Sequence, residues 1–380
     1  MPLFKNWEES SMVEWKKLGD VCDIKGRIGF RGYTRDDQVE KGEGAISLSP
    51  GNITNSVLYY DSCTYITWDK FEESPEIMVN EGDILLCKTA SVGKVARVRQ
   101  LPEKATINPQ LVLIKNIKTN PQYLFYVLDD NPFQTIIKGL AGVGSVPNVS
   151  QAKLSSIQIP VPSLTEQTRI VEILDTFTAS IENLKEQIAE RRKQYEYYRD
   201  QLLNLEGEEG VEMKTLGEVC KLERGVRVVK KDLQEEGSIP VYQNSLIPLG
   251  YYDRSNYPPN TSFVICAGAA GEVGFSDKAF WAADDCTCIV CSPLVKSKFV
   301  YYFLMVKQFM LKAQVRKASV PRLSKDVIGK ISFPLTSVEE QSRIVFILDT
   351  FEASIANLEA QLELREKQYE YYRNKLLTFE

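Results

Sequence analysis

Cysteine is the residue type whose spacing in this chain comes closest to a chemical site. The segment Cys286-Thr287-Cys288-Ile289-Val290-Cys291 places three thiols within six residues, a density seen in zinc sites. Cys286 and Cys288 also alternate with their neighbours as the core positions of a strand do, and no second CxxC pair accompanies them. The pattern therefore favours buried core cysteines, and a zinc site is the alternative.

Histidine, the commonest catalytic base, is absent from all 380 residues. Its absence excludes Ser-His and Cys-His nucleophiles and most catalytic zinc sites, although carboxylate and lysine chemistry remains possible. The phosphate-binding pattern GxxxxGK[ST] is also missing. Asn256-Tyr257-Pro258-Pro259-Asn260 has the prolines of an amino-methyltransferase tetrad but the wrong flanking residues, and we interpret it as a turn. We therefore expect no catalytic residues, no metal site and no cofactor in this chain.

Other cysteines mark a repeat that organises the whole chain. Cys22 and Cys220 occupy matching places, and we expect the same of Cys87 and Cys266, all as buried apolar residues. The strongest copies are residues 166–206 and 340–380, in which 27 of 41 positions are identical at an offset of 174. A duplication of this length predicts two equivalent structural units.

Each copy of the repeat predicts a long helix. Apolar side chains recur at alternating steps of four and three residues, which is typical of a coiled-coil seam. Ser163 or Thr165 can cap the first helix and Ser337 the second, and each helix is expected to be about 60 Å long. Arg191 and Arg365 interrupt the seam. Either each buries its aliphatic stem and pairs its charged head with a glutamate, or each sets the register of the helices. The seam residues are Ile170, Leu174, Phe177, Ile181, Leu184, Ile188, Tyr195, Tyr198 and Leu202, then Ile344, Leu348, Phe351, Ile355, Leu358, Leu362, Tyr369, Tyr372 and Leu376.

The sequence ahead of each helix predicts a β-rich domain. The openings of the two halves match at an offset of 198, so the second half is 24 residues shorter in its middle. Residues 82–87 and 261–266 have the composition of buried strands that lead into glycine-containing turns. We expect an α+β fold with two β-rich domains, residues 1–158 and 207–330, and two spacer helices, residues 159–206 and 331–380. If the chain enters and leaves the second domain at nearby points, the helices run antiparallel and the molecule has internal pseudo-twofold symmetry.

Charge and hydropathy bear on the partners and location of the chain. The formal net charge is −5, but each duplicated segment carries −3, so the remainder carries +1. Three further acids lie in the connection at residues 207–213, which leaves the β-rich parts basic. No apolar run approaches the roughly 20 residues of a membrane span, and residues 1–10 lack a signal-peptide pattern. We expect a cytoplasmic protein without a membrane partner.

Taken together, these motifs resemble those of the specificity (S) subunit of type I restriction-modification systems. The resemblance rests on the P-x-P-S-L-T-E-Q-x-R-I-V-x-I-L-D run of Ile159 to Asp175 and on its copy, Ile331 to Asp349. It also rests on the doubled S-V-P-x-x-S at residues 145–150 and 319–324, on the domain-opening L-G-x-V-C and on the G-D-I-L-L strand.

The resemblance implies a subunit with no catalysis of its own. Each β-rich domain would read one half of a bipartite, asymmetric site in double-stranded DNA, and the helices would set the spacing. Two methyltransferase subunits, and restriction subunits in the full complex, would be the protein partners and would bring S-adenosylmethionine, ATP and magnesium. A protein–protein adaptor and a restriction–methylation fusion are the rival interpretations, and the missing catalytic motifs disfavour the second.

If the domains read DNA, their loops must supply the contacts. Residues 138–145 and 312–319 have equal length, but the first segment is rich in glycine whereas the second carries Arg and Lys. Such a change suits two domains that read different sequences, since Arg binds guanine and glycine lets the backbone approach a phosphate. A solvated loop with a drifted sequence is the alternative for any one residue. The candidates are Arg27, Lys88, Ser91, Lys94, Lys138, Gly142, Gly144, Arg224, Arg227, Lys312, Arg316, Lys317 and Arg322.

A second apolar stripe on the helices predicts a docking surface for the methyltransferase subunits. The alternative is packing against the β-rich domains of the chain itself, mainly near each helix start. The candidates are Ile173, Tyr197, Leu203, Ile347, Tyr371 and Leu377.

Overall fold

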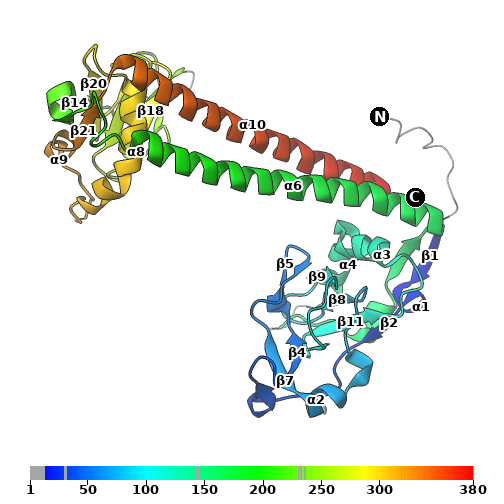
Figure 1. The fold of residues 1–380 in the computed structure, drawn as a ribbon. Helices are drawn as coiled ribbons and strands as arrows, with labels where there is room; N and C mark the ends of the chain where they lie inside the picture. Colours follow the sequence, from blue (N-terminus) through cyan, green and yellow to red (C-terminus); the bar gives the residue numbers. More distant parts are fainter. Residues whose placement is uncertain are drawn as a thin grey trace. The chain divides into compact units, whose positions relative to one another are not determined.

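The computed structural model describes residues 13–29, 32–142, 146–229, 231, 233–234, 237–317 and 319–379. The chain divides into a first unit, residues 1–182 and 363–380, and a second unit, residues 183–362. Each unit contains small sheets, short helices and part of both long helices (Figure 1). The predicted α+β class is therefore confirmed.

Two four-stranded sheets and a hairpin build the first unit. One sheet has the order β2-β11-β8-β9 and the other β10-β4-β7-β3, and strands β5 and β6 form the hairpin. Helix α3 (Pro121–Asp129) lies against β9, and α4 (Asn131–Leu140) packs on α3 (Figure 1). The strands are β2 (Asp23–Lys25), β3 (Gln38–Val39), β4 (Gly44–Leu48), β5 (Ile53–Thr54), β6 (Val57–Leu58), β7 (Thr64–Thr67), β8 (Ile84–Cys87), β9 (Val95–Arg97), β10 (Ala105–Ile107) and β11 (Leu111–Lys115).

A four-stranded and a three-stranded sheet build the second unit. Their orders are β14-β20-β17-β18 and β16-β15-β19, and helix α8 (Ser297–Ala313) packs on β17 and β18 (Figure 1). Strands β8 and β17 confirm the two predicted buried strands. The strands are β14 (Cys220–Arg224), β15 (Ile239–Tyr242), β16 (Gly250–Tyr252), β17 (Thr261–Ile265), β18 (Val273–Ser276), β19 (Trp281–Ala282) and β20 (Cys286–Cys291).

Each unit begins with the same short structure. Strand β1 (Glu14–Lys17) pairs antiparallel with β12 (Gln158–Val161), just as β13 (Glu212–Thr215) pairs with β21 (Ser332–Leu335). One turn of helix follows, α1 (Leu18–Val21) or α7 (Leu216–Val219). The chain therefore returns to its starting point in each unit, immediately before a long helix.

The long helices are α6 (Leu164–Leu203) and α10 (Val338–Leu377), each of 40 residues. Ser163 and Ser337 accept hydrogen bonds from the amides of Glu166 and Glu340, so both serine caps are confirmed. Thr165, the alternative cap, lies inside the first helix.

Within each unit the two helix segments run antiparallel. In the first unit the ring of Phe177 stacks on Tyr372 at 5.3 Å, and in the second Tyr198 stacks on Phe351 at 5.5 Å. These are equivalent pairs in the repeat. Tyr198 is 47% exposed, the least buried of the predicted seam, yet it still contacts the other helix. The predicted coiled coil is therefore confirmed.

The two arginines in the seam lie over aromatic rings. The guanidinium of Arg191 lies 5.9 Å from the ring of Phe351, and that of Arg365 lies 5.6 Å from Phe177. A cation is attracted by the negative face of such a ring. These contacts do not test whether either arginine sets the register.

The cysteine-rich strand belongs to a hydrophobic core. Cys286 and Cys288 are fully buried in β20 and pack with Phe263 and Phe280. Their interpretation as core side chains is therefore confirmed. Among the described residues, no helix is both long and apolar enough to cross a membrane.

Candidate nucleic-acid interface

A tight turn follows the central strand β8 in the first unit. The amide of Cys87 donates to the carbonyl of Lys94 at 2.8 Å, and the amide of Gly93 donates to the carbonyl of Cys87 at 3.0 Å. Gly93 has a φ of 98°, a backbone conformation that side chains other than glycine disfavour. The turn places Lys88, Ser91 and Lys94 at one end of the sheet.

The second unit repeats this turn bond for bond after β17. The amide of Ile265 donates to Glu272, and the amide of Gly271 donates back to Ile265, both at 2.8 Å. Gly271 has a φ of 89°. Cys87 therefore corresponds to Ile265, and the predicted match between Cys87 and Cys266 is wrong by one residue. In the matching pattern of backbone hydrogen bonds, Cys266 corresponds to Lys88.

The repeated S-V-P-x-x-S segments close these turns from the other side. Amides of the turns donate to the prolines, Ala90 to Pro147 at 2.9 Å and Gly268 to Pro321 at 3.2 Å. The following residues pair with the same turns, since isolated β-bridges join Thr89 to Asn148 and Ala267 to Arg322. The motif is therefore a backbone support, and positions 148 and 322 are equivalent points on it.

The doubled E-Q pair anchors each long helix to its unit. The Gln167 side chain donates to the carbonyl of Pro162 and accepts from the amide of Asn120, both at 2.8 Å. Gln341 donates to the carbonyls of Leu294 and Thr336 and accepts from the amide of Lys296, at 2.8 to 2.9 Å. Both glutamines are buried. Their fixed hydrogen bonds explain why this residue type stands in both copies.

The aspartate of the I-L-D sequence is a second anchor. Asp175 accepts a 2.5 Å hydrogen bond from the Tyr126 hydroxyl, and Asp349 accepts one of the same length from Tyr302. Burial raises the pKa of both tyrosines, and the neighbouring carboxylates raise it further. The tyrosines therefore remain neutral donors, and each long helix is hydrogen-bonded near its start to the helix, α3 or α8, that packs on the turn-bearing sheet of its own unit.

The structure removes one predicted DNA contact and leaves several in place. Arg27 is only 5% exposed, and its guanidinium donates to the Ile107 carbonyl at 3.1 Å and to the Thr106 hydroxyl at 3.2 Å. The idea that Arg27 contacts DNA is therefore wrong, because its charge is used inside the fold. Gly144 lies outside the described residues, and Gly142 is exposed with a φ of 74°.

Internal bonds occupy three more of the predicted cations. Lys94 donates to the carbonyls of Pro50 and Ile53, Arg224 to the carbonyl of Asp284, and Lys312 lies 3.7 Å from Glu272. The other predicted cations lie partly or fully at the surface. Lys88 is half-buried, and the exposed candidates are Ser91, Lys138, Arg227, Arg316, Lys317 and Arg322.

The turn of the first unit borders a cavity of about 460 Å³ with a mixed polar and apolar lining. Lys94, Lys138 and Gln134 line it, together with Asn55 and Ser56 at the tip of the β5–β6 hairpin. In the described part of the second unit no such hairpin is present. The predicted shortening of the second half therefore falls beside the turn that carries the candidate contacts.

Comparison with known proteins bears on what these units are. A family model for the type I restriction modification DNA specificity domain matches residues 11–191 and again residues 208–365. The chain belongs to this family. The doubled match agrees with the two units and their repeated turns.

Relatives and solved structures extend the match to nearly the whole chain. A Haemophilus influenzae protein described as a type I restriction enzyme specificity subunit is 28% identical over 98% of this chain and 97% of its own. The specificity subunit of the Escherichia coli type I restriction enzymes EcoR124I and EcoR124II is 32% identical over 69% of this chain and 72% of its own. The S subunit structure from M. genitalium covers 99% of this chain and 98% of its own with a TM-score of 0.65 and 17% identity, and supports the fold.

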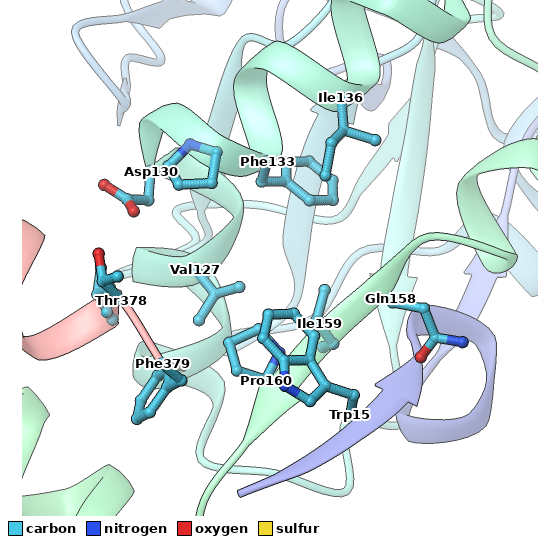
Figure 2. A pocket seen from close by; sticks show the side chains of 12 residues that line it. Trp15, Val127, Asp130, Phe133, Ile136, Gln158, Ile159, Pro160, Thr378 and Phe379 are labelled. Carbon is cyan, nitrogen blue, oxygen red and sulfur yellow. The ribbon is translucent and has the colours of Figure 1, made fainter.

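The second apolar stripe divides into covered and uncovered residues. Ile173, Leu203 and Leu377 are buried in the cores of their own units, so their prediction as exposed docking residues is wrong. Leu377 also lines a cavity of about 190 Å³. Trp15, Phe133 and Phe379 line the same cavity (Figure 2). Ile347 is half-buried, whereas Tyr197 and Tyr371 are 62% and 60% exposed.

Sequence reasoning did not single out Asn148, which lies beside the turn of the first unit. Asn148 is exposed and accepts a 2.8 Å hydrogen bond from the Thr89 hydroxyl through its side-chain oxygen. The signal was present, because Asn148 matches Arg322 at the repeat offset of 174 and lies inside the S-V-P-x-x-S motif.

Proposed function

We propose that this chain is a non-catalytic subunit that supplies DNA sequence specificity to methyltransferase subunits. Each unit reads one half of a bipartite, asymmetric site in double-stranded DNA. The observation that carries the proposal is the pair of turns with matching backbone hydrogen bonds and different side chains. One frame with two side-chain sets is what recognition of two unlike half-sites requires, because base edges are read by side-chain type.

The long helices suit the spacing and docking roles. Each is anchored to its unit by a buried glutamine and an aspartate, so helix length would be transmitted to the distance between the half-sites. Tyr197 and Tyr371 are equivalent and exposed, which suits docking of two identical methyltransferase subunits. Restriction subunits would join the full complex, and S-adenosylmethionine, ATP and magnesium would belong to the partners.

Sequencing of methylated bases tests the proposal. The full chain is co-expressed with its methyltransferase subunit in a host that lacks adenine methylation, and the methyltransferase subunit alone is the control. We expect adenine methylation confined to one bipartite, asymmetric motif. Methylation independent of sequence, or a pattern unchanged from the control, would overturn the proposal and favour the adaptor.

Helix length tests the spacing role separately. Seven residues inserted into each helix lengthen it by about 10 Å, close to three base pairs of DNA. The preferred spacer should lengthen while both half-sites remain unchanged. Altered half-site sequences with an unchanged spacer would contradict the spacing role.

A further inference from the structure

Two arginines face each other in the second unit. Arg316 and Arg322 form an isolated antiparallel bridge in which the amide of each donates to the carbonyl of the other, at 2.9 and 3.2 Å. Residues directly opposite in an antiparallel pair project their side chains to the same face, where like charges repel. Both side chains are exposed.

Nothing within the described chain neutralises this pair. The neighbouring Lys312 lies near Glu272 and Arg224 lies near Asp284, but neither Arg316 nor Arg322 has an ion pair or side-chain hydrogen bond among the residues that the structure describes. Two adjacent uncompensated guanidinium groups favour an electron-rich acceptor from outside the chain. On its other side the backbone of Arg322 is bridged to Ala267. The backbone from which the Arg322 side chain projects is therefore fixed on both sides.

The equivalent position of the first unit carries a different polar group. Asn148 is bridged to Thr89 as Arg322 is bridged to Ala267. The Thr89 hydroxyl donates to the Asn148 side-chain oxygen, which fixes the orientation of the amide. The oxygen keeps a second lone pair and the nitrogen keeps its two hydrogens, so the amide can still both accept and donate.

We propose that positions 148 and 322 are the corresponding base-reading positions of the two units, with Asn148 contacting adenine and Arg322 contacting guanine. This inference rests on the proposed function and names residues that carry it. Arg pairs with the O6 and N7 atoms of guanine through two hydrogen bonds, and Asn pairs with the N6 and N7 atoms of adenine.

The difference between the units argues for bases over phosphates. Phosphates are the same at every DNA sequence, so a phosphate-contacting position has no reason to change from arginine in one unit to asparagine in the other. A base-reading position must change when the half-site changes. Arg316 can lie over a neighbouring phosphate, which would offset its repulsion from Arg322.

Arg322→Gln is the main test, made in the full chain co-expressed with its methyltransferase subunit. We expect one G·C position in one half-site to relax, with discrimination at that position falling about 5- to 150-fold. Arg322→Lys should keep methylation at most sites but lose much of the same discrimination, because lysine cannot make the paired contact. Lys278→Gln removes an exposed cation from the same unit and should leave the motif intact.

Asn148→Asp tests the first unit by removing the donors of the amide. We expect relaxation at one A·T position in the other half-site, while Gln100→Glu, an exposed amide-to-acid change in the same unit, leaves the motif unchanged. Co-purification with the methyltransferase subunit and an unchanged melting temperature will show that each variant is folded.

Three outcomes would overturn the inference. They are a motif unchanged by Arg322→Gln, a uniform loss of methylation at every site as expected of a phosphate contact, and an effect of both substitutions on the same half-site. All three require that the unaltered chain directs methylation to a bipartite motif. If it does not, the proposed function itself has failed, and the two failures are thereby distinguished.

Discussion

In the first unit Asn148 lies beside Thr89, whereas in the second the same backbone position carries Arg322 beside Ala267. The surrounding amides and carbonyls pair in the same way in both units. The side chains at the turn differ, and so do the surroundings, since the first unit has a four-stranded second sheet and the β5–β6 hairpin where the described second unit has a three-stranded sheet. The comparison teaches that the main chain of this fold provides the support and that the side chains are free to diverge.

The helix anchors show the opposite behaviour, because their side chains are retained. Gln167 and Gln341 make their hydrogen bonds with main-chain groups, which any sequence in the neighbouring loop can supply. The anchor can therefore persist while the loop changes. If this comparison is sound, replacing either anchoring glutamine should destabilise its unit. The loss in the free energy of unfolding should scale with the number of hydrogen bonds removed.

The largest effect is expected from Gln341→Ala. It leaves the carbonyls of Leu294 and Thr336 and the amide of Lys296 without the partner that the fully buried glutamine supplies, and a group left unsatisfied inside the fold costs about 1–3 kcal/mol. We expect a loss of about 3–5 kcal/mol in the free energy of unfolding, and about 2–4 kcal/mol for Gln167→Ala, which removes two bonds. Urea titration measures both.

Gln361→Ala serves as the control for these anchors. Gln361 is exposed, and within the part of the chain that the structure describes its side chain bonds only to Asn357, one turn away in the same helix. Its loss should therefore cost about 0.5 kcal/mol or less. Equal costs for Gln361→Ala and Gln341→Ala would show that the buried glutamines do not anchor the helices.

A smaller effect separates Arg373 from its repeat equivalent, Arg199. Arg373 donates to the Asp130 carboxylate at 3.0 Å and to the Asp129 carbonyl at 2.7 Å in a mostly buried site. Arg199 pairs with the exposed Asp200 beside it. Breaking a buried pair leaves a charge without a partner, so Arg373→Met should cost about 2–3 kcal/mol and Arg199→Met about 1 kcal/mol or less.

The acidic residues beside Arg373 should make the stability cost of Arg373→Met depend on pH. Burial raises the pKa of the Asp129 carboxyl despite the opposing effects of Ser56 and Arg373. Burial lowers the pKa of Arg373, but Asp129, Tyr369 and Asp130 together raise it above its ordinary value. The Asp130 carboxylate lies 3.0 Å from the Arg373 guanidinium and the Asp129 carboxylate lies 3.9 Å from it, so Asp130 is the closer acidic partner.

The sign of the pH effect follows from the raised pKa of Asp129. A folded-state pKa above the unfolded value means that stability is lost as the pH rises through it. Loss of Arg373 removes an effect that lowers this pKa. The penalty of Arg373→Met should therefore shrink as the pH is lowered from 7 toward about 4. A penalty that grows on acidification would contradict this account.

The sequence predicted the repeated elements better than the contacts. The heptad seam, the serine caps and strands β8 and β17 follow from local periodicity and turn chemistry, and they were predicted. Arg27 was misjudged because its partners, Thr106 and Ile107, lie about 80 residues away. Asn148 was missed because its significance depends on the bridge to Thr89, which only the folded backbone reveals.

The exposed residues of the long helices allow a test of methyltransferase docking, because some of them are duplicated by the repeat and others are not. Tyr197 and Tyr371 occupy matching positions, and each packs edge-on against the next tyrosine, at 5.4 and 5.3 Å. Phe346 and Leu364 are also exposed, but the repeat places Glu172 and Glu190 at their equivalents. Two identical partners should use the duplicated residues.

Substitution of each tyrosine should therefore weaken one of two docking events. We expect Tyr197→Glu and Tyr371→Glu each to reduce the methyltransferase bound per chain, from about two copies toward one, as measured by light scattering of the purified complex. Phe346→Ala and Leu364→Ala are the controls and should not change the ratio. An unchanged ratio in both tyrosine variants would exclude this surface as the docking site.

The smallest effect is expected at a thiol pair that only the second unit has. Cys220 lies opposite Cys291 in the β14–β20 ladder, with the sulfur atoms 3.5 Å apart. The hydrogen bond from Cys220 lowers the pKa of Cys291 and raises that of Cys220. In the first unit burial raises the pKa of Cys22 to about 12, and Ile117 stands at the repeat equivalent of Cys291.

Oxidised glutathione should therefore join the two thiols of the second unit. The Cys291 thiolate attacks glutathione disulfide and releases one glutathione, and Cys220 then displaces the second, so two protein thiols become one disulfide. Directly opposed strand positions have Cα separations that a disulfide accepts. The number of free thiols counted in denaturant should fall from eight to six. In the Cys22→Ser variant, which starts with seven thiols, it should fall to five. Cys291→Ser should block the loss of a thiol pair, and if it does not, the reactive pair lies elsewhere and the two units do not differ in this respect.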